Sequence, residues 1–236
     1  MRRLWKLGHI GRGRLATLRA LVGWLVLASG GPAHAESFVR RLAERALERG
    51  IVQEARGDIA QALSSYDEAV RTDSTLGAAA LRLGRLRERM GDRAEAELLY
   101  TRATSAPETS ADAYYARAML RAAAQQRTEA LADLAESVAL APEPARLRVL
   151  AGWYIEARAW PAALAVWRAL LAHAQEAGDD AERREARVTV AALSWLAGDT
   201  DPVLAGLRSD NWVRRSLSRV ARPAKSEAQG VRKLTP

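Results

Sequence analysis

The sequence predicts an all-α fold, a right-handed α-solenoid of antiparallel helix pairs. Residues 50–103 repeat themselves: after a shift of 34 positions, Gly50 aligns with Gly84 and Tyr66 aligns with Tyr100. A fixed period of this length is typical of solenoids built from helix pairs. Ala, Arg and Leu, which favour helices, dominate the composition, and runs of β-branched and aromatic residues typical of strands are missing.

Five predicted helix pairs follow one another along the chain. Their ranges are 38–55 with 58–71, 75–90 with 92–105, 110–124 with 127–140, 144–158 with 161–177, and 180–197 with 200–208, and a last helix is expected over 210–221. Gly57, Gly91 and Gly198 each stand just past a first helix, where glycine adopts the left-handed conformation without a side-chain penalty. The aspartate that follows, as in Asp58 and Asp92, is expected to cap the next helix.

The first 35 residues have the organisation of a secretory signal peptide. Six basic residues and no acidic residue accompany a short apolar run over 20–28, and an A-x-A sequence ends at Ala35, where we expect cleavage. The apolar run is too short to cross a hydrocarbon core of about 30 Å as a helix. Cleavage would place the remaining chain in the periplasm or outside the cell, whereas an uncleaved anchor is the alternative.

The formal net charge of +8 is concentrated at the two ends of the chain. Residues 1–35 carry +6, residues 36–210 carry −4 and residues 211–236 carry +6, so the basic total does not indicate a nucleic-acid-binding domain. The absence of cysteine excludes disulfides and thiolate metal sites. After the signal peptide we therefore expect a helical solenoid over 36–222 and a disordered basic tail over 223–236, which could contact an envelope surface.

The repeat resembles the tetratricopeptide repeat (TPR) family, whose pattern is W-x2-L-G-x2-Y in the first helix, A-x3-F in the second and a closing Pro. Leu83-Gly84 matches the first element, and Pro142 matches the last. The second element is represented by Ala62/Tyr66, Ala96/Tyr100, Ala130/Leu134 and Ala163/Trp167. The resemblance covers 43–177 well and 180–208 weakly. It departs from the pattern at Arg49 and Arg117, which stand where Leu is usual.

This resemblance implies a non-catalytic scaffold that binds a protein or an extended peptide through a concave groove lined by first helices. The candidate partner-binding residues are Arg85, Glu88, Arg89, Tyr115, Met119, Arg148 and Glu156. Their arginines and tyrosine would suit a segment with an acidic side chain or a terminal carboxylate. Alternatively, they are solvated arginines beside a packed tyrosine. The clamp of chaperone-binding members is not seen, because Leu47 and Ile51 occupy its first-repeat positions.

No constellation of residues indicates catalysis, and we expect neither enzymatic activity nor a cofactor. After cleavage the chain would hold one histidine, His173, which excludes most His-based metal sites and triads. Trp153 and Trp167 are expected to pack between repeats, whereas Trp160 and Trp212 are expected to be exposed. Because exposed Trp rings stack on sugars, an accessory role in envelope polysaccharide export or surface adsorption is the alternative to a protein-binding scaffold.

Overall fold

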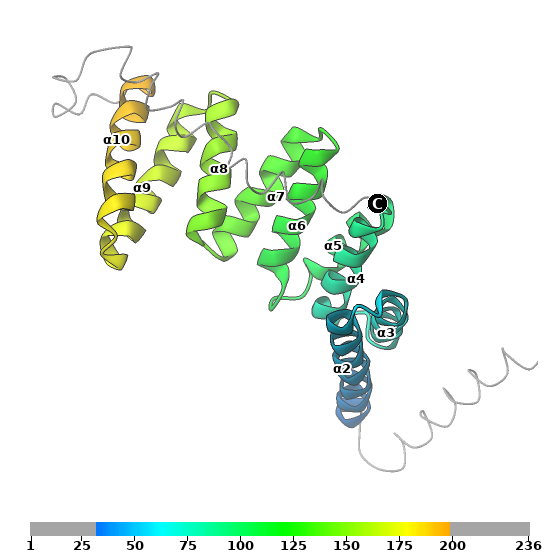
Figure 1. Ribbon diagram of the computed structural model, residues 1–236. Coiled ribbons are helices and arrows are strands. Elements are labelled where there is room, and N and C mark those ends of the chain that lie inside the picture. Colours follow the sequence, from blue (N-terminus) through cyan, green and yellow to red (C-terminus); the bar gives the residue numbers. More distant parts are fainter. Residues whose placement is uncertain (1–31, 199–236) are drawn as a thin grey trace, which may run out of the picture. The chain divides into compact units, whose positions relative to one another are not determined.

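The computed structural model describes residues 32–198, with side chains from residue 36, and these residues form nine α-helices and no strand. The helices are α2 (Pro32–Arg56), α3 (Ile59–Thr72), α4 (Gly77–Arg89), α5 (Arg93–Ala103), α6 (Ser110–Ala123), α7 (Arg127–Leu140), α8 (Pro144–Glu156), α9 (Trp160–Ala177) and α10 (Asp180–Leu196) (Figure 1). The predicted all-α fold is confirmed.

Several predictions fall outside the described residues. These are most of the signal peptide, the helices over 200–208 and 210–221, the tail over 223–236, and Trp212. The first helix was expected from residue 38 but begins at Pro32, where proline is tolerated because N–H groups in the first turn have no helical partner. The predicted cleavage position after Ala35 thus falls in the first turn of α2, and cleavage itself stays a prediction.

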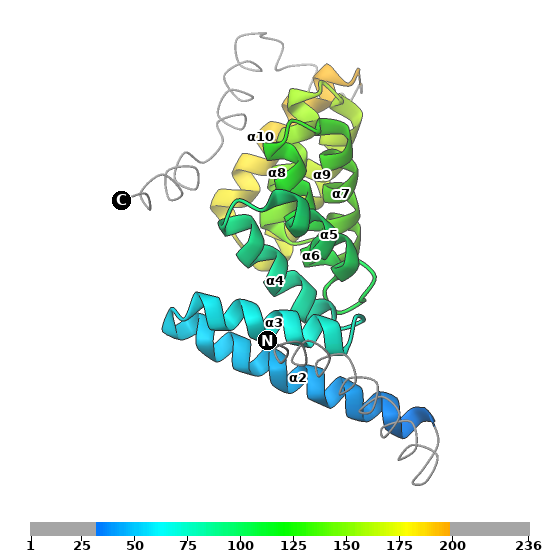
Figure 2. The same cartoon turned by 90° about the vertical axis from the view of Figure 1, so that its right-hand side faces the viewer.

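The helices form two compact units. The N-terminal unit ends at Thr109 and holds α2 to α5, and the C-terminal unit begins at Ser110 and holds α6 to α10. In the N-terminal unit α2 packs along α3, α3 also packs against α4, and α4 packs along α5 (Figure 2). In the C-terminal unit each helix from α6 to α10 lies beside the next (Figure 1). The N-terminal unit is therefore a stack of two helix pairs, and the described part of the C-terminal unit holds two pairs followed by α10.

A left-handed residue joins the two helices of each pair that lies wholly within the described residues. Gly57 and Gly91 both have φ of 85°, as the sequence predicts, and Gly198 has φ of 74° after α10. Gln125 and Arg158 take the same conformation in the third and fourth pairs, with φ of 62° and 56°. The backbone hydrogen bond that closes each turn is kept, so the turn persists even where a side chain makes it unfavourable.

The capping prediction holds at one aspartate and fails at another. Asp92 accepts a hydrogen bond from the backbone N–H of Glu95 at 3.3 Å. Asp58 also stands at the N-cap, but its side chain makes no capping hydrogen bond. Its carbonyl instead accepts the N–H of Ala62 at 2.9 Å, as the first bond of α3 requires. The Gly-Asp pair therefore guarantees the turn but not the side-chain cap.

Gly50 and Gly84 mark the closest contacts between the helices of a pair. A Cβ atom on Gly84 would lie 2.7 Å from Cε1 of Tyr100, and one on Gly50 would overlap the ring of Tyr66 in the same way. Both tyrosine rings are fully buried. Glycine is required at these positions because each aromatic ring lies directly on the backbone of the first helix.

Replacing Gln125 with Gly should raise the free energy of unfolding by about 0.5–1 kcal/mol, since relief of the left-handed strain exceeds the added freedom of the unfolded chain. Urea unfolding followed by circular dichroism measures the change. Gly57→Ala, at the equivalent turn, should shift stability by a similar amount in the opposite direction. An unchanged or lower midpoint for Gln125→Gly would contradict the assigned strain.

Replacing Gly84 with Ala should lower the free energy of unfolding by about 1–3 kcal/mol, because the added methyl group meets the Tyr100 ring. The loss should be smaller in a Tyr100→Leu background, which removes the part of the ring that the methyl group meets. Thermal unfolding of the single and double variants gives the coupling between the two sites. Gly152→Ala is the control: a Cβ atom there would meet nothing within 4 Å, so no loss is expected. Equal losses in both backgrounds would argue against the contact.

Candidate partner-binding surface

The seven candidate residues lie on first helices, but in two different units. Arg85, Glu88 and Arg89 lie on α4 in the N-terminal unit. In the C-terminal unit, Tyr115 and Met119 lie on α6, and Arg148 and Glu156 lie on α8. Each unit therefore presents its own candidate surface, built from its own side chains.

Glu54 of α2 organises the surface of the N-terminal unit. Its carboxylate accepts the hydroxyl of Tyr66 at 2.7 Å and a guanidinium N–H of Arg89. Arg82 lies 3.7 Å from the same carboxylate. Two arginines of α4 thus share one carboxylate of α2, and this arrangement links the first helices of the first two pairs.

Glu88 of α4 repeats the tyrosine contact one period later. It accepts the hydroxyl of Tyr100 at 2.6 Å, as Glu54 accepts that of Tyr66. Burial and the hydrogen bond to Glu54 raise the pKa of Tyr66 to about 12, and burial and Glu88 likewise raise the pKa of Tyr100. Glu88 therefore helps to hold the second helix of its pair. Sequence reasoning missed both bonds, although Glu54 and Glu88 stand 34 residues apart, like the tyrosines.

Arg85 is exposed like Arg82 and Arg89 but, unlike them, makes no hydrogen bond or ion pair with any side chain that the structure describes. It stands between Arg82 and Arg89 on α4. We call these three residues the α4 arginine row. Glu54 and Glu88 are the carboxylates beside the row, so one positive charge is left unmatched on this surface.

The candidate charges of the C-terminal unit are matched within that unit. Arg148 donates to Glu182 of α10 at 2.7 Å and lies 3.6 Å from Glu185. Glu156 accepts from Arg127 of α7 at 2.9 Å. The predicted basic character of Arg148 is thus balanced by two carboxylates, and this surface is not a basic patch.

Tyr115 and Met119 are both half-buried and pack beside the core of the C-terminal unit. The guanidinium carbon of Arg146, on α8, lies 5.6 Å from the centroid of the Tyr115 ring. Arg146 is itself buried and pairs with Asp112 of α6 and, at 3.3 Å, with Glu143. Tyr115 is therefore a packed tyrosine, as the alternative to a binding surface supposes.

Asp133 explains why Arg117 replaces the usual leucine in the third pair. The buried carboxylate of Asp133 accepts two hydrogen bonds from Arg117, at 2.8 and 2.7 Å, and one from Arg121 at 2.9 Å. In the second pair the equivalent position holds Leu83, which is buried. A buried carboxylate needs such partners. The sequence signal was Asp133 itself, an acidic residue within the run of small and apolar residues of α7.

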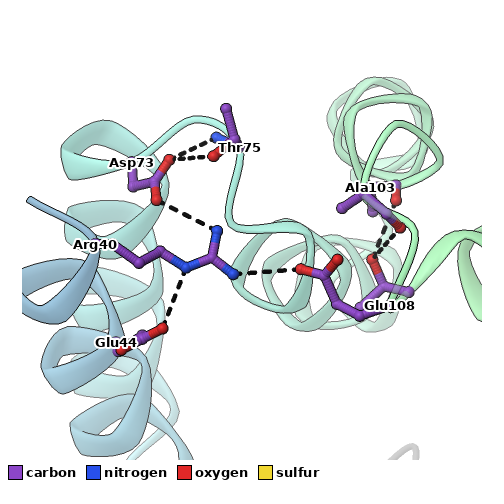
Figure 3. Close-up of polar contacts among 8 residues, drawn as sticks. Arg40, Glu44, Asp73, Thr75, Ala103 and Glu108 are labelled. Carbon is purple, nitrogen blue, oxygen red and sulfur yellow. Dashed lines mark hydrogen bonds and ion pairs between the residues drawn. The ribbon is translucent and has the colours of Figure 1, made fainter. Parts of the chain in front are cut away.

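Arg40 links three segments of the N-terminal unit. Its guanidinium lies among the carboxylates of Glu44 on α2, Asp73 after α3 and Glu108 after α5, at 3.1, 3.5 and 3.4 Å (Figure 3). Burial tends to raise the pKa of Asp73, but hydrogen bonds from Thr75 and the charge of Arg40 lower it below its usual value. Arg40 therefore secures the loops of this unit and has no role on the candidate surface.

The tryptophans only partly follow the prediction. Trp167 is buried, and Trp153 is half-buried against the core, as expected. The expectation that Trp160 is exposed was wrong, because its ring packs half-buried against the cluster that contains Trp167. Trp195, on α10, is instead the most exposed tryptophan of the described residues.

Within residues 36–198 no group of His, Cys, Asp and Glu side chains could hold a metal ion. No helix within the described range is long and apolar enough to cross a membrane.

Alkaline solution should destabilise the chain partly through Tyr66. The unfolded tyrosine loses its proton near the ordinary pKa of 10.0, whereas the folded one keeps it until about 12. The folded state thus binds more protons across this window, so its stability is complete below the unfolded pKa and falls as the pH rises. Urea midpoints on both sides of this window should fall less steeply in Tyr66→Phe than in the parent. Parallel profiles would contradict the buried hydroxyl.

Neither a protein-family model nor a curated protein matches the sequence. Solved structures do match. A tetratricopeptide repeat protein from Parabacteroides merdae is 17% identical with a TM-score of 0.52, and the match covers 80% of this chain and 77% of that one. YrrB, described as a TPR protein with an unusual peptide-binding site, is 16% identical with a TM-score of 0.51, over 80% of this chain and 91% of its own.

A third structure, the MamA protein, is 15% identical with a TM-score of 0.50, over 82% of this chain and 97% of its own. At these identities the likeness concerns the fold. It agrees with the observed helix pairs, the left-handed turns and the small and aromatic positions that recur after 34 residues. The chain therefore has the fold of the tetratricopeptide repeat proteins.

Proposed function

We propose that the chain is an exported, non-catalytic scaffold that binds an acidic extended segment of another protein through the concave face of its repeats. The observation that carries this proposal is Arg85. It is exposed, it makes no hydrogen bond or ion pair with a described side chain, and it stands between two arginines that Glu54 already holds. A ligand carboxylate can therefore bind Arg85 without first displacing an internal partner.

The neighbours of Arg85 favour a carboxylate ligand. Arg82 and Arg89 share Glu54, and Glu88 is the only other carboxylate beside the row among the described residues, so a carboxylate of the ligand would complete the charge balance of the surface. Hydrogen bonds between guanidinium groups and carboxylates are short and directional, and they are stronger than those between neutral groups. Because Glu54 orients the outer arginines beforehand, less side-chain freedom is lost when the ligand binds.

The candidate residues of the C-terminal unit offer a different surface. Arg148 is matched by carboxylates, and the half-buried Tyr115 and Met119 offer apolar contact rather than charge. A peptide-binding site is named for YrrB, one of the structures with the same fold. For this chain it supports the proposal as an analogy of fold.

Export rests on the sequence of residues 1–35, which favours a periplasmic or secreted location. Cell fractionation with mass spectrometry of the N-terminus would test it. The alternative role in polysaccharide export or adsorption has lost the support of Trp160, which is half-buried, and Trp212 lies outside the described residues. The exposed Trp195 is a further candidate for contact with a sugar. A flat tryptophan fluorescence titration with envelope polysaccharides would remove that alternative.

Replacing Arg85 with Ala should weaken binding of a short, fluorescein-labelled, Glu-rich extended peptide by about 10-fold, the loss expected for one hydrogen bond between charged groups. Fluorescence anisotropy with the full chain measures it. Arg102→Ala is the matched control, because Arg102 is an exposed arginine on α5, a second helix. A Lys-rich peptide should bind at least ~10-fold more weakly than the Glu-rich one. Equal affinities of the two variants, or of the two peptides, would refute the assignment of this surface.

A further inference from the structure

The first helix of the N-terminal unit has an exposed face that the other first helices bury. On α2, Leu42 and Val52 are 42% and 48% exposed, and Arg45 and Arg49 between them are exposed as well. Their spacing of three, four and three residues places all four on one side of the helix. We call these four residues the α2 end face.

The equivalent face of α4 is completely covered. Positions are matched by counting back from the left-handed residue, which is Gly57 after α2 and Gly91 after α4. The positions of the α2 end face then correspond to Leu76, Ala79, Leu83 and Leu86, which are 4%, 0%, 2% and 1% exposed. The helix that packs against α4 from the preceding pair is α3. A helix is therefore what covers this face in the same unit.

The C-terminal unit repeats this arrangement. Counting back from Arg158 identifies Glu143, Arg146, Leu150 and Trp153. Glu143, just before α8, is exposed, whereas Leu150 and Trp153 lie in one cluster with Leu131 and Val138 of the preceding helix α7. Counting back from Gly198 identifies Ala186 and Leu193 of α10, which lie in one cluster with Trp167 and Leu170 of α9. This position on a first helix is thus built to receive a second helix, and no helix precedes α2 among the described residues.

The charges around the α2 end face indicate the chemistry of its occupant. Arg45 is exposed and forms no hydrogen bond or ion pair with the side chains of residues 36–198, and the same holds for Arg41, one turn before it, and for Arg56 at the end of α2. Arg49 pairs with Glu68 at 2.7 Å. Glu48 is the one carboxylate next to the face on α2. The face therefore has an apolar residue at each end, Leu42 and Val52, and two arginines, Arg45 and Arg49, between them.

We propose that the α2 end face binds an acidic amphipathic α-helix of another protein. The leucine and valine would contact its apolar stripe, and the free arginines would pair with carboxylates that flank that stripe. The chain's own ends are poor occupants, because residues 1–31 carry six basic residues and no acidic one, and residues 211–236 carry seven basic and one acidic. This site is separate from the α4 arginine row and does not depend on it.

The test uses a fluorescein-labelled helical peptide of about 20 residues, roughly 30 Å long, with Leu at three- and four-residue spacing and Glu at the flanking positions. Anisotropy titrations with the full chain should show saturable binding. The double variant Leu42→Glu/Val52→Glu should weaken it at least ~10-fold. Arg45→Glu leaves the apolar contacts in place and should also weaken binding of the peptide. This single variant tests the face even if the double variant unfolds. A Lys version of the peptide should bind at least ~10-fold more weakly.

Leu98→Glu is the matched control, because Leu98 is 56% exposed on α5 and lies outside the face. It should leave the affinity unchanged, as should Arg85→Ala, which separates this site from the proposed function. Absence of binding, or an equal loss in Leu98→Glu, would overturn the proposal. Three other results would also overturn it. Tighter binding after deletion of residues 1–31 would assign the face to the chain's own upstream segment. A dimer of the full chain that Leu42→Glu/Val52→Glu dissociates would assign it to a second copy, and displacement of the peptide by phosphatidylglycerol vesicles would assign it to lipid.

Discussion

The contact between a tyrosine ring and the backbone of a glycine determines the geometry of the N-terminal unit. Because Tyr66 and Tyr100 lie directly on Gly50 and Gly84, the two helices of each pair are fixed at a short separation. The ring is anchored at its far end by a hydrogen bond to the carboxylate four residues after the glycine. Since Glu54 also binds Arg89, the core contact positions one end of the α4 arginine row.

The C-terminal unit solves the same packing problem with other residues. Ala118 and Leu134 share one core cluster, and Ala151 and Trp167 share another. Alanine thus replaces the glycine of the first helix in both pairs, and leucine or tryptophan replaces the tyrosine of the second helix. The carboxylate position becomes Ile155 in the fourth pair, and the buried Nε1 of Trp167 accordingly makes no hydrogen bond with a described residue. The guanidinium of Arg148 lies 5.9 Å from the Trp167 ring, held there by Glu182.

The period and the turns could be predicted from the sequence because they depend on local backbone requirements. Gly57 and Gly91 take the left-handed conformation that their positions predict, and the aromatic of the family pattern is buried in each described pair where it is kept. Interactions between helices could not be predicted, because they depend on which side chains meet across a pair. The bond between Arg117 and Asp133 and the burial of Trp160 are examples. The candidate residues lie on first helices, as the repeat pattern predicts, but the partners of their charges became known only from the structure.

Ion pairs between successive first helices show which charges remain for a partner. Within a unit, Arg89 binds Glu54, Arg146 binds Asp112 and Arg148 binds Glu182, across separations of 35, 34 and 34 residues. Repetition thus brings arginines of one first helix to carboxylates of its neighbour, and such pairs join repeats rather than bind ligands. An exposed arginine that makes no hydrogen bond or ion pair with a described side chain does not join repeats in this way. Arg85 and Arg45 are of this kind, and they lie on different helices and different faces. This separation favours two acidic partners, an extended one and a helical one, over a single ligand.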